Sequence, residues 1–328
     1  MINDLQSING AVREHSYWVS LLRDEIGRAI IGQRYMIDRL IVGLLTNGHI
    51  LIEGVPGIGK TLAVSSLAKT IQAEFKRIQF TVDLQPADIL GSLVFDQKTL
   101  EFSAKKGPIF ANIVLADEIN RASARVQSAL IESMGEGQVT IGDCSFLLPD
   151  PFMVLATKNP IDHDGVYELP ESQVDRFMMK LRIEYPTKLE ELRILHAHQL
   201  VGDRVTIKPI IALDQILESR KIVDKIYIDE KIMEYIVDIV HETRNPEHRL
   251  GLDGIIENGA SPRASLALSK CSRAWAFLQG RGYVTPQDVK DIGLDVLRHR
   301  IIPTYRGVAD GFTGEEIAKR ILNSTRIP

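Results

Sequence analysis

Short apolar runs alternate with helical stretches through the first half of this chain. Residues 49–53, 113–116 and 153–157 are nearly continuous apolar runs, a pattern typical of strands buried on both faces. Residues 75–82 and 177–183 have the character of two further strands, the latter with the alternation of an edge strand. Helical patterns lie between most of these runs. The order therefore predicts a parallel sheet covered by helices on both faces.

Helical patterns dominate the two ends of the chain. Residues 1–45 have apolar positions at helical spacing, and the strand signal disappears after Pro186. Residues 245–260 are rich in glycine and are expected to form a loop. Polar capping residues, in some cases followed by proline, mark helix starts in the second half. They are Thr187 with Glu190, Asp229, Ser261 with Pro262, and Thr285 with Asp288.

This pattern predicts two domains. An α/β domain spans residues 1–185, and residues 1–30 form its helical lead-in. A smaller all-helical domain spans residues 186–328.

Composition narrows the functional classes. The chain has 328 residues, of which 45% are hydrophobic and 25% charged, with a net charge of −4. That acidic balance argues against a dedicated nucleic-acid binder. No run approaches the roughly 18 apolar residues of a membrane helix, and no secretory signal is visible, so we expect a cytoplasmic protein. Cys144 and Cys271 are expected to be reduced, partly buried thiols.

A glycine-rich segment follows the first predicted strand. Residues 54–61 (GVPGIGKT) fit the pattern G-x-x-x-x-G-K-[ST] in full, between a strand and a helix. Glycines let backbone N–H groups surround a phosphate, and the helix N-terminus favours its negative charge. Lys60 is then expected to contact the β- and γ-phosphates, and Thr61 to hold Mg2+. A plain glycine turn with an exposed lysine is the alternative, and the strand and helix around it disfavour it.

Polar side chains follow two other predicted strands. Asp117 and Glu118 end the run 113–116, where Asp117 is expected to bind Mg2+ and Glu118 to polarise the attacking water. Asn159 follows the strand 153–157, and parallel strands end at the same edge of a sheet. Asn159 is therefore a candidate to orient the same water or touch the γ-phosphate.

Eight sequence blocks follow one another along the chain: ILIEGVPGIGKT (50–61), DLQPADILGS (83–92), GPIFANIVLADEINRA (107–122), QVTI (138–141), VLATKNP (154–160), ELPESQVDRF (168–177), ASPRA (260–264) and GYVTPQDV (282–289). In these blocks and their order, the chain resembles the MoxR family of AAA+ ATPases from about residue 31 to near residue 320. The resemblance implies a P-loop NTPase (AAA+) fold with a three-layer parallel sheet and a smaller helical lid.

The resemblance also implies roles for individual residues. Walker A falls on Lys60 and Thr61, Walker B on Asp117 and Glu118, sensor 1 on Asn159, the arginine finger on Arg176, and sensor 2 on Arg263. The cofactors implied are ATP and Mg2+. The expected nucleotide contacts are Gly54, Val55, Pro56, Gly57, Ile58, Gly59, Lys60, Thr61 and Leu62, with Ile31 and Gly32 closing over the adenine. Arg176 would act on the site of a neighbouring subunit, and Arg263 would reach the γ-phosphate from the lid.

Two hairpins and three basic residues receive no catalytic role from the resemblance. Residues 92–106 and 136–150 look like hairpins added to the family's fold, which contact either a client or only solvent. Lys158 stands where glutamine is more usual. Arg121 and Arg125 are candidates for contact with a neighbouring subunit, although a solvated helix face is the preferred interpretation.

The leading functional hypothesis is an ATPase in a homo-oligomeric ring, with six subunits as the family expectation, that remodels or activates a protein client. The resemblance implies a chaperone-like role, often with a partner carrying a von Willebrand factor A domain. An ATPase subunit of a metal-insertion complex such as magnesium chelatase is the open alternative. A self-contained kinase and a nucleic-acid motor are weaker alternatives. The first lacks a visible acceptor pocket, and the second lacks basic charge.

Overall fold

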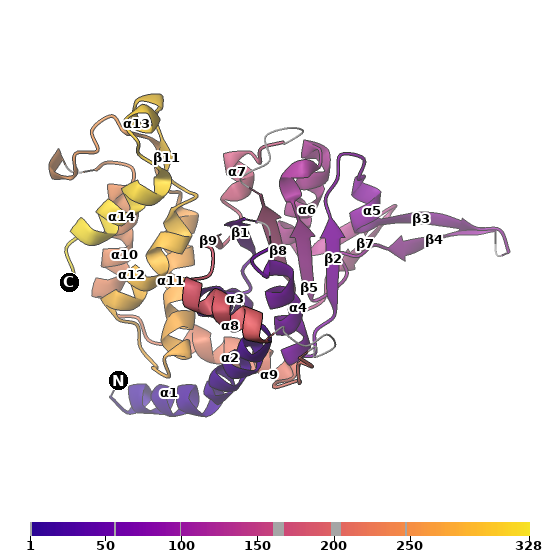
Figure 1. Ribbon diagram of the computed structural model, residues 1–328, viewed down its shortest axis with the longest axis horizontal. Helices are drawn as coiled ribbons and strands as arrows, with labels where there is room; N and C mark the ends of the chain where they lie inside the picture. The colour runs from indigo at the N-terminus through magenta and orange to yellow at the C-terminus, as the bar shows by residue number, and fades with distance from the viewer. Residues whose placement is uncertain (1, 56, 99, 160–166, 198–204, 247) are drawn as a thin grey trace. The chain divides into compact units, whose positions relative to one another are not determined.

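The apolar runs of the first half form one five-stranded sheet in the computed structural model, which describes residues 2–55, 57–98, 100–159, 167–197, 205–246 and 248–328 (Figure 1). The strand order is β2-β5-β8-β1-β9. The strands are β1 (Ile50–Gly54), β2 (Phe75–Gln79), β5 (Ile113–Asp117), β8 (Met153–Lys158) and β9 (Met179–Ile183). The pairs β2–β5, β5–β8 and β8–β1 are parallel, as the sequence predicts.

Burial explains the position of each strand. β5, β8 and β1 are almost fully buried and occupy the middle of the sheet. β2 and β9 form its edges. In β2 only Ile78 is buried, and in β9 every second residue is buried. The apolar runs therefore predicted not only the strands but also which of them are central.

Helices complete this part of the chain. They are α2 (Tyr17–Ala29), α3 (Arg34–Leu45), α4 (Lys60–Thr70), α5 (Pro86–Leu90), α6 (Ala124–Glu136), α7 (Glu171–Val174), α8 (Lys188–Ala197), and the 3-10 turn η1 (Ile119–Arg121). Thr187 and Glu190 make the predicted capping bonds at the start of α8. Leu192 and Leu195 of this helix are exposed.

A buried histidine joins three elements of the sheet region. The N–H of Val154 donates to Nδ1 of His49 at 3.0 Å, so the ring proton sits on Nε2, which donates to the carbonyl of Met134 at 3.1 Å. The ring of Phe152 contacts it edge-on. Burial lowers the pKa of His49 to about 4, which keeps the ring neutral.

Two antiparallel hairpins leave the sheet region, as predicted for residues 92–106 and 136–150. The first pairs β3 (Gly91–Asp96) with β4 (Glu101–Lys106), and the second pairs β6 (Gln138–Ile141) with β7 (Cys144–Leu147). The β3–β4 hairpin projects away from the sheet (Figure 1). Its exposed apolar side chains are Leu93, Val94, Phe95, Leu100 and Phe102.

The second half is helical, as predicted. Its helices are α9 (Leu213–Lys225), α10 (Glu230–Glu242), α11 (Pro262–Leu278), α12 (Pro286–Leu297), α13 (Tyr305–Ala309) and α14 (Gly314–Ser324), and the N-terminal α1 (Ile2–His15) packs with them. The side chains of Asp229, Ser261 and Thr285 cap α10, α11 and α12. The expected loop over residues 245–260 contains the turn η2 (His248–Leu250) and the strand β10 (Ile256–Asn258), which pairs with β11 (Ile302–Pro303). The helical part therefore also holds a short two-stranded ribbon.

The chain divides into two compact units. One comprises Ser20–Arg176 and Leu181–Gln215, and the other comprises Met1–Val19, Phe177–Lys180 and Ile216–Pro328. These units differ from the predicted domains mainly at the two segments 1–19 and 186–215. The domain boundary after residue 185 stays a prediction.

Two smaller expectations concern the thiols and membranes. Both cysteines are free, but Cys144 is exposed rather than partly buried, whereas Cys271 is buried in α11. Within the described residues, no helix combines the length and apolar character needed to cross a bilayer.

Candidate functional site

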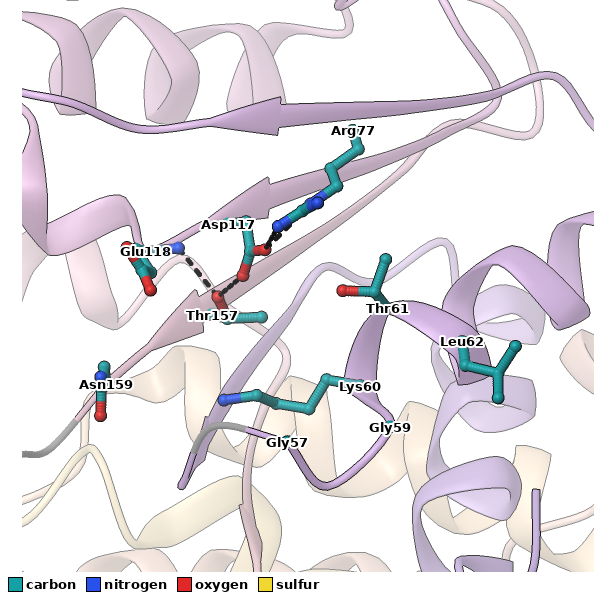
Figure 2. A pocket seen from close by; sticks show the side chains of 10 residues that line it. All are labelled: Gly57, Gly59, Lys60, Thr61, Leu62, Arg77, Asp117, Glu118, Thr157 and Asn159. Atoms are coloured by element: carbon teal, nitrogen blue, oxygen red, sulfur yellow. Dashed lines mark hydrogen bonds and ion pairs between the residues drawn. The ribbon is translucent and has the colours of Figure 1, made fainter. Parts of the chain in front are cut away.

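The carboxyl ends of three neighbouring strands meet at one cavity. β1, β8 and β5 are adjacent in the sheet, and their ends carry the glycine-rich segment, Asn159 and Asp117. The cavity, called here the strand-end cavity, measures about 430 Å³ (Figure 2). It is lined by Gly57, Gly59, Lys60, Thr61, Leu62, Arg77, Asp117, Glu118, Thr157 and Asn159.

The glycine-rich segment takes the backbone path that its composition allows. β1 ends at Gly54 and α4 begins at Lys60. Gly57 and Gly59 have φ angles of 84° and 83°, in the left-handed region that favours glycine. The turn therefore delivers the N-terminus of α4 to the cavity, where its unpaired N–H groups favour an anion.

Lys60 projects into the strand-end cavity. Its Nζ donates to the carbonyl of Gly54 at 2.6 Å. Burial lowers the pKa of Lys60, while the carboxylates of Asp117 and Glu118 act in the opposite direction. Figure 2 shows the ammonium and the Thr61 hydroxyl on one side of the cavity and the two carboxylates on the other.

Both carboxylate oxygens of Asp117 accept hydrogen bonds. Oδ1 accepts from the Thr157 hydroxyl at 2.5 Å. Oδ2 accepts from Nη2 and Nε of Arg77 at 2.6 and 3.0 Å. The Thr157 hydroxyl in turn accepts from the backbone N–H of Glu118 at 2.8 Å. Thr157, only 1% exposed, therefore fixes the two acidic residues relative to each other.

Glu118 has an unusual backbone conformation. Its φ of 57° and ψ of 50° lie in the left-handed region, which costs a non-glycine residue free energy. Its Oε2 accepts from Nε2 of Gln79 at 3.0 Å and forms an ion pair with Nε of Arg121 at 2.9 Å. Arg121 therefore pairs with Glu118 within the chain while its side chain stays 45% exposed, and a contact with a neighbouring subunit stays a prediction.

Asn159 and its neighbour lie where β8 ends. Asn159 lines the strand-end cavity, as its position after a buried strand predicts. Lys158 forms an ion pair with Glu168 at 2.5 Å and does not line that cavity. The departure from glutamine at position 158 therefore leaves the strand-end cavity unchanged.

A second cavity of about 390 Å³, called here the helix-side cavity, shares Gly57, Gly59 and Leu62 with the first. Its full lining is Ala29, Ile30, Ile31, Gln33, Gly57, Ile58, Gly59, Leu62, Tyr185, Pro186, Glu191 and Ile194. This cavity is more apolar in character and joins the segment before α3 to the start of α8. Its place beside the glycine-rich turn suits a planar base whose phosphates enter the strand-end cavity.

Most predicted nucleotide contacts lie at these two cavities. Ile31 lines the helix-side cavity, whereas Gly32 lines an adjoining hollow of about 490 Å³. Gly32 has a φ of 85°, and a Cβ there would lie 2.5 Å from the carboxyl carbon of Glu190. The carbonyl of Gly54 holds Lys60, and Val55 is absent from both cavity linings. Pro56 lies outside the described residues.

The two predicted arginines lie elsewhere. Nη1 of Arg176 donates to the carbonyl of Ile131 in α6 at 3.4 Å. Arg263 is in the first turn of α11, in the helical unit, where its N–H donates to the Ser261 hydroxyl. Neither arginine is among the residues that line the two cavities. Their roles stay predictions.

Sequence reasoning missed Arg77, Gln79 and Thr157. Arg77 and Gln79 alternate on β2, and Gln79 pairs in register with Asp117 on β5. The signal was present, because polar residues at i and i+2 of a strand share a face. It could be used only once β2 was known to lie beside β5, which the residue pattern does not establish.

The donor set fits a nucleotide with a divalent cation. The Thr61 hydroxyl and the Asp117 carboxylate are hard oxygen ligands of the kind that Mg2+ prefers, and phosphates supply the rest. Lys60 and the helix N-terminus provide positive charge for those phosphates. The acidic Glu118 stands at the same cavity, where a base for a water molecule is needed.

Comparisons with known proteins agree with this geometry. The profile described as "ATPase family associated with various cellular activities (AAA)" matches residues 49–179, and that described as "AAA lid domain" matches residues 253–321. Chaperone MoxR1 of Mycobacterium tuberculosis is 44% identical over 93% of this chain and 81% of its own length. Protein YeaC of Bacillus subtilis is 41% identical over 99% of this chain and 96% of its own length. The crystal structure of a candidate ATPase from Cytophaga hutchinsonii superposes with a TM-score of 0.90 at 42% identity, covering 100% of this chain and 99% of that one.

Proposed function

Because the chain belongs to the MoxR family of AAA+ ATPases, we propose that it binds ATP with Mg2+ and hydrolyses the nucleotide at the strand-end cavity. The observation that carries the proposal is the meeting of Lys60, Thr61, Asp117 and Glu118 in one cavity at the strand ends. These side chains come from two separate strand-end segments. The cavity therefore supplies phosphate binding, cation binding and a base together.

Each residue has a role that its chemistry supports. Lys60 and the N-terminus of α4 bind the β- and γ-phosphates. Thr61 and Asp117 would hold Mg2+, which supplies positive charge against the phosphates. Glu118 takes the proton of the attacking water, and Asn159 orients that water. Leu62 and Ile31 contact the adenosine from the helix-side cavity.

We further propose that the protein works as a homo-oligomeric ring, with six subunits as the family expectation. Support comes from Arg176, which lies outside the linings of its own chain's two cavities. An arginine supplied by a neighbour stabilises charge that develops on the transferred phosphoryl group. Arg263 would serve the same phosphate from the helical lid.

The work done by hydrolysis is proposed to be the remodelling or activation of a protein client. The name of the relative MoxR1, a chaperone, supports this role over metal insertion as in magnesium chelatase. The exposed apolar side chains of the β3–β4 hairpin, among them Phe95 and Phe102, suit contact with such a client. A partner with a von Willebrand factor A domain and a cytoplasmic location stay predictions from the sequence.

ATP turnover per chain, measured against protein concentration from nanomolar to tens of micromolar, tests the proposal. A rate per chain that rises with concentration is expected, because the site needs Arg176 of a neighbour. Arg176→Ala should abolish the rise while leaving nucleotide binding unchanged.

The opposite results are equally clear. A rate that stays flat while sizing shows monomers would contradict the shared site but not ATP hydrolysis. No turnover at any concentration, with Lys60→Ala indistinguishable from the parent protein in nucleotide binding, would contradict the proposed chemistry itself.

A further inference from the structure

Arg77 binds the same carboxylate that the proposed Mg2+ would use. Its Nη2 and Nε both donate to Oδ2 of Asp117, at 2.6 and 3.0 Å (Figure 2). The Arg77 side chain is 49% exposed, whereas that of Asp117 is 14% exposed. The carboxylate is therefore enclosed, and the guanidinium reaches it from the open side.

The sheet fixes this contact. β2 and β5 are parallel neighbours, with Arg77 opposite Leu115 and Gln79 opposite Asp117. Side chains at alternate positions of a strand share a face, so Arg77 and Gln79 both reach towards the acidic end of β5. The register of β2 against β5 thus brings Arg77, two residues before the end of β2, within reach of Asp117.

The remaining oxygen of Asp117 is also engaged. Oδ1 accepts from the hydroxyl of Thr157, which is buried and held in place by the N–H of Glu118. Thr157 therefore has little freedom to move. A cation that approaches Asp117 meets one oxygen bound by a buried hydroxyl and the other bound by a guanidinium with freedom to swing into solvent.

We propose that Arg77 is a resident counter-ion of Asp117 that competes with Mg2+, so that the metal enters only as the guanidinium leaves Oδ2. Two positive charges beside one carboxylate repel each other, and the two donors of Arg77 occupy Oδ2, the oxygen that Thr157 does not bind. This inference rests on the proposed function, because it assigns a residue to the loading of the same site.

A second contact connects this exchange to Glu118. Nη2 of Arg77 also donates to Oε1 of Gln79 at 2.9 Å, and Nε2 of Gln79 donates to Oε2 of Glu118 at 3.0 Å. When Arg77 leaves Asp117, Gln79 loses its donor and is free to reorient. Loading of the metal therefore changes the hydrogen bonding of the proposed base.

The affinity for Mg2+ tests the proposal directly. A fluorescent ATP analogue is bound to the protein in EDTA-treated buffer, and MgCl2 is then titrated while the fluorescence is recorded. Arg77→Gln should lower the half-saturating Mg2+ concentration about three- to fivefold, the range expected for loss of a half-exposed ion pair. Arg77→Lys, which keeps the charge but not the two-pronged contact, should fall between this variant and the parent protein.

Lys76→Gln is the matched control. Lys76 lies on the same strand and pairs with Glu74 at 3.3 Å. Its substitution therefore removes one positive charge without changing a contact of Asp117. It should leave the half-saturating concentration within about twofold of the parent value. A melting curve of each variant checks that the fold is intact.

Other results would overturn the inference. An Arg77→Gln protein that needs the same or more Mg2+ would mean that Arg77 does not compete with the metal. If Arg77→Gln and Lys76→Gln changed the half-saturating Mg2+ concentration equally, the change would come from the lower positive charge of the protein and not from the contact with Asp117. A parent protein that binds no nucleotide at all would overturn the proposed function as well, which separates the two failures.

Discussion

The hydroxyl of Thr157 donates to Asp117 at 2.5 Å while accepting the backbone N–H of Glu118 at 2.8 Å. One buried side chain on β8 thus connects the proposed metal ligand on β5 to the proposed base beside it. The contact holds Glu118 in its left-handed conformation without using the Glu118 side chain.

Thr157→Val should impair hydrolysis more than nucleotide binding. Valine keeps the shape but leaves the Glu118 N–H without an acceptor, which costs about 1–3 kcal/mol when buried. Where that cost raises the activation free energy of hydrolysis, kcat should drop roughly 10- to 100-fold. Thr157→Ser retains the hydroxyl and serves as the control, with kcat expected within a few-fold of the parent. Equal kcat values for the valine variant and the parent would contradict this positioning role.

Glu118→Gln should separate binding from chemistry. The amide keeps the size of the side chain but cannot take a proton from water, so turnover should fall by about 100-fold or more. Binding of a fluorescent ATP analogue with Mg2+ should change little, because Lys60, Thr61 and Asp117 are intact. Lys60→Ala is the complementary variant, expected to weaken binding itself. Turnover by the glutamine variant within tenfold of the parent would assign the base elsewhere.

Gly32→Ala should weaken nucleotide binding through the helix-side cavity. The left-handed φ of 85° costs an alanine about 1–2 kcal/mol. The added Cβ would also push Glu190, which receives two hydrogen bonds from Thr187 at the start of α8. Loss of these two bonds would loosen the start of α8, the helix whose Ile194 lines the cavity. The readouts are the affinity for a fluorescent ATP analogue and the urea midpoint.

Gly27→Ala provides the matched control for that variant. Gly27 lies in α2, and a Cβ there meets nothing within 4 Å. Stability should stay level or rise by up to about 1 kcal/mol, because glycine is unfavourable in a helix. If both variants bind nucleotide equally well, the spacing between Gly32 and α8 does not control the cavity.

His49 should make the protein less stable in mild acid. Its folded pKa of about 4 is below the ordinary value of 6.5, so between these values the unfolded chain binds the proton more readily. The free energy of unfolding is therefore at its full value above pH 6.5 and decreases as the pH falls towards 4. The loss reaches about 3 kcal/mol from this residue, at 1.36 kcal/mol per pKa unit.

Urea unfolding of the parent and of His49→Asn between pH 4 and 7 measures that contribution. Asparagine retains an acceptor for the Val154 N–H but does not titrate. The pKa of His299 is also lowered by burial, so only the difference between the two proteins reports on His49. Identical pH dependence in both would contradict a neutral, buried His49.

Local patterns predicted the parts of the fold that depend on local chemistry. The apolar runs identified β1, β5 and β8, and the caps at Asp229, Ser261 and Thr285 begin helices as expected. The pattern did not reveal β10, whose pairing with β11 joins residues more than forty positions apart. A short strand of this kind is stabilised by a distant partner rather than by its own residues.

Local patterns likewise predicted some residues of the candidate site and not others. The glycine-rich segment, Asp117, Glu118 and Asn159 could be found because each follows a strand that its own residues define. Arg77 and Arg121 could not, because their importance comes from which carboxylate they face. Exposed arginines on a strand or turn have no local pattern that distinguishes an ion pair in a site from a solvated charge.

The thiols of this protein have a practical consequence. Cys144 is exposed at the start of β7, the second strand of the second hairpin, and Cys271 is buried in α11. A maleimide dye should therefore attach to the native protein at one defined place without engineered cysteines. In a mixture of donor- and acceptor-labelled chains, energy transfer between such dyes would report directly on how many copies associate and how quickly they exchange.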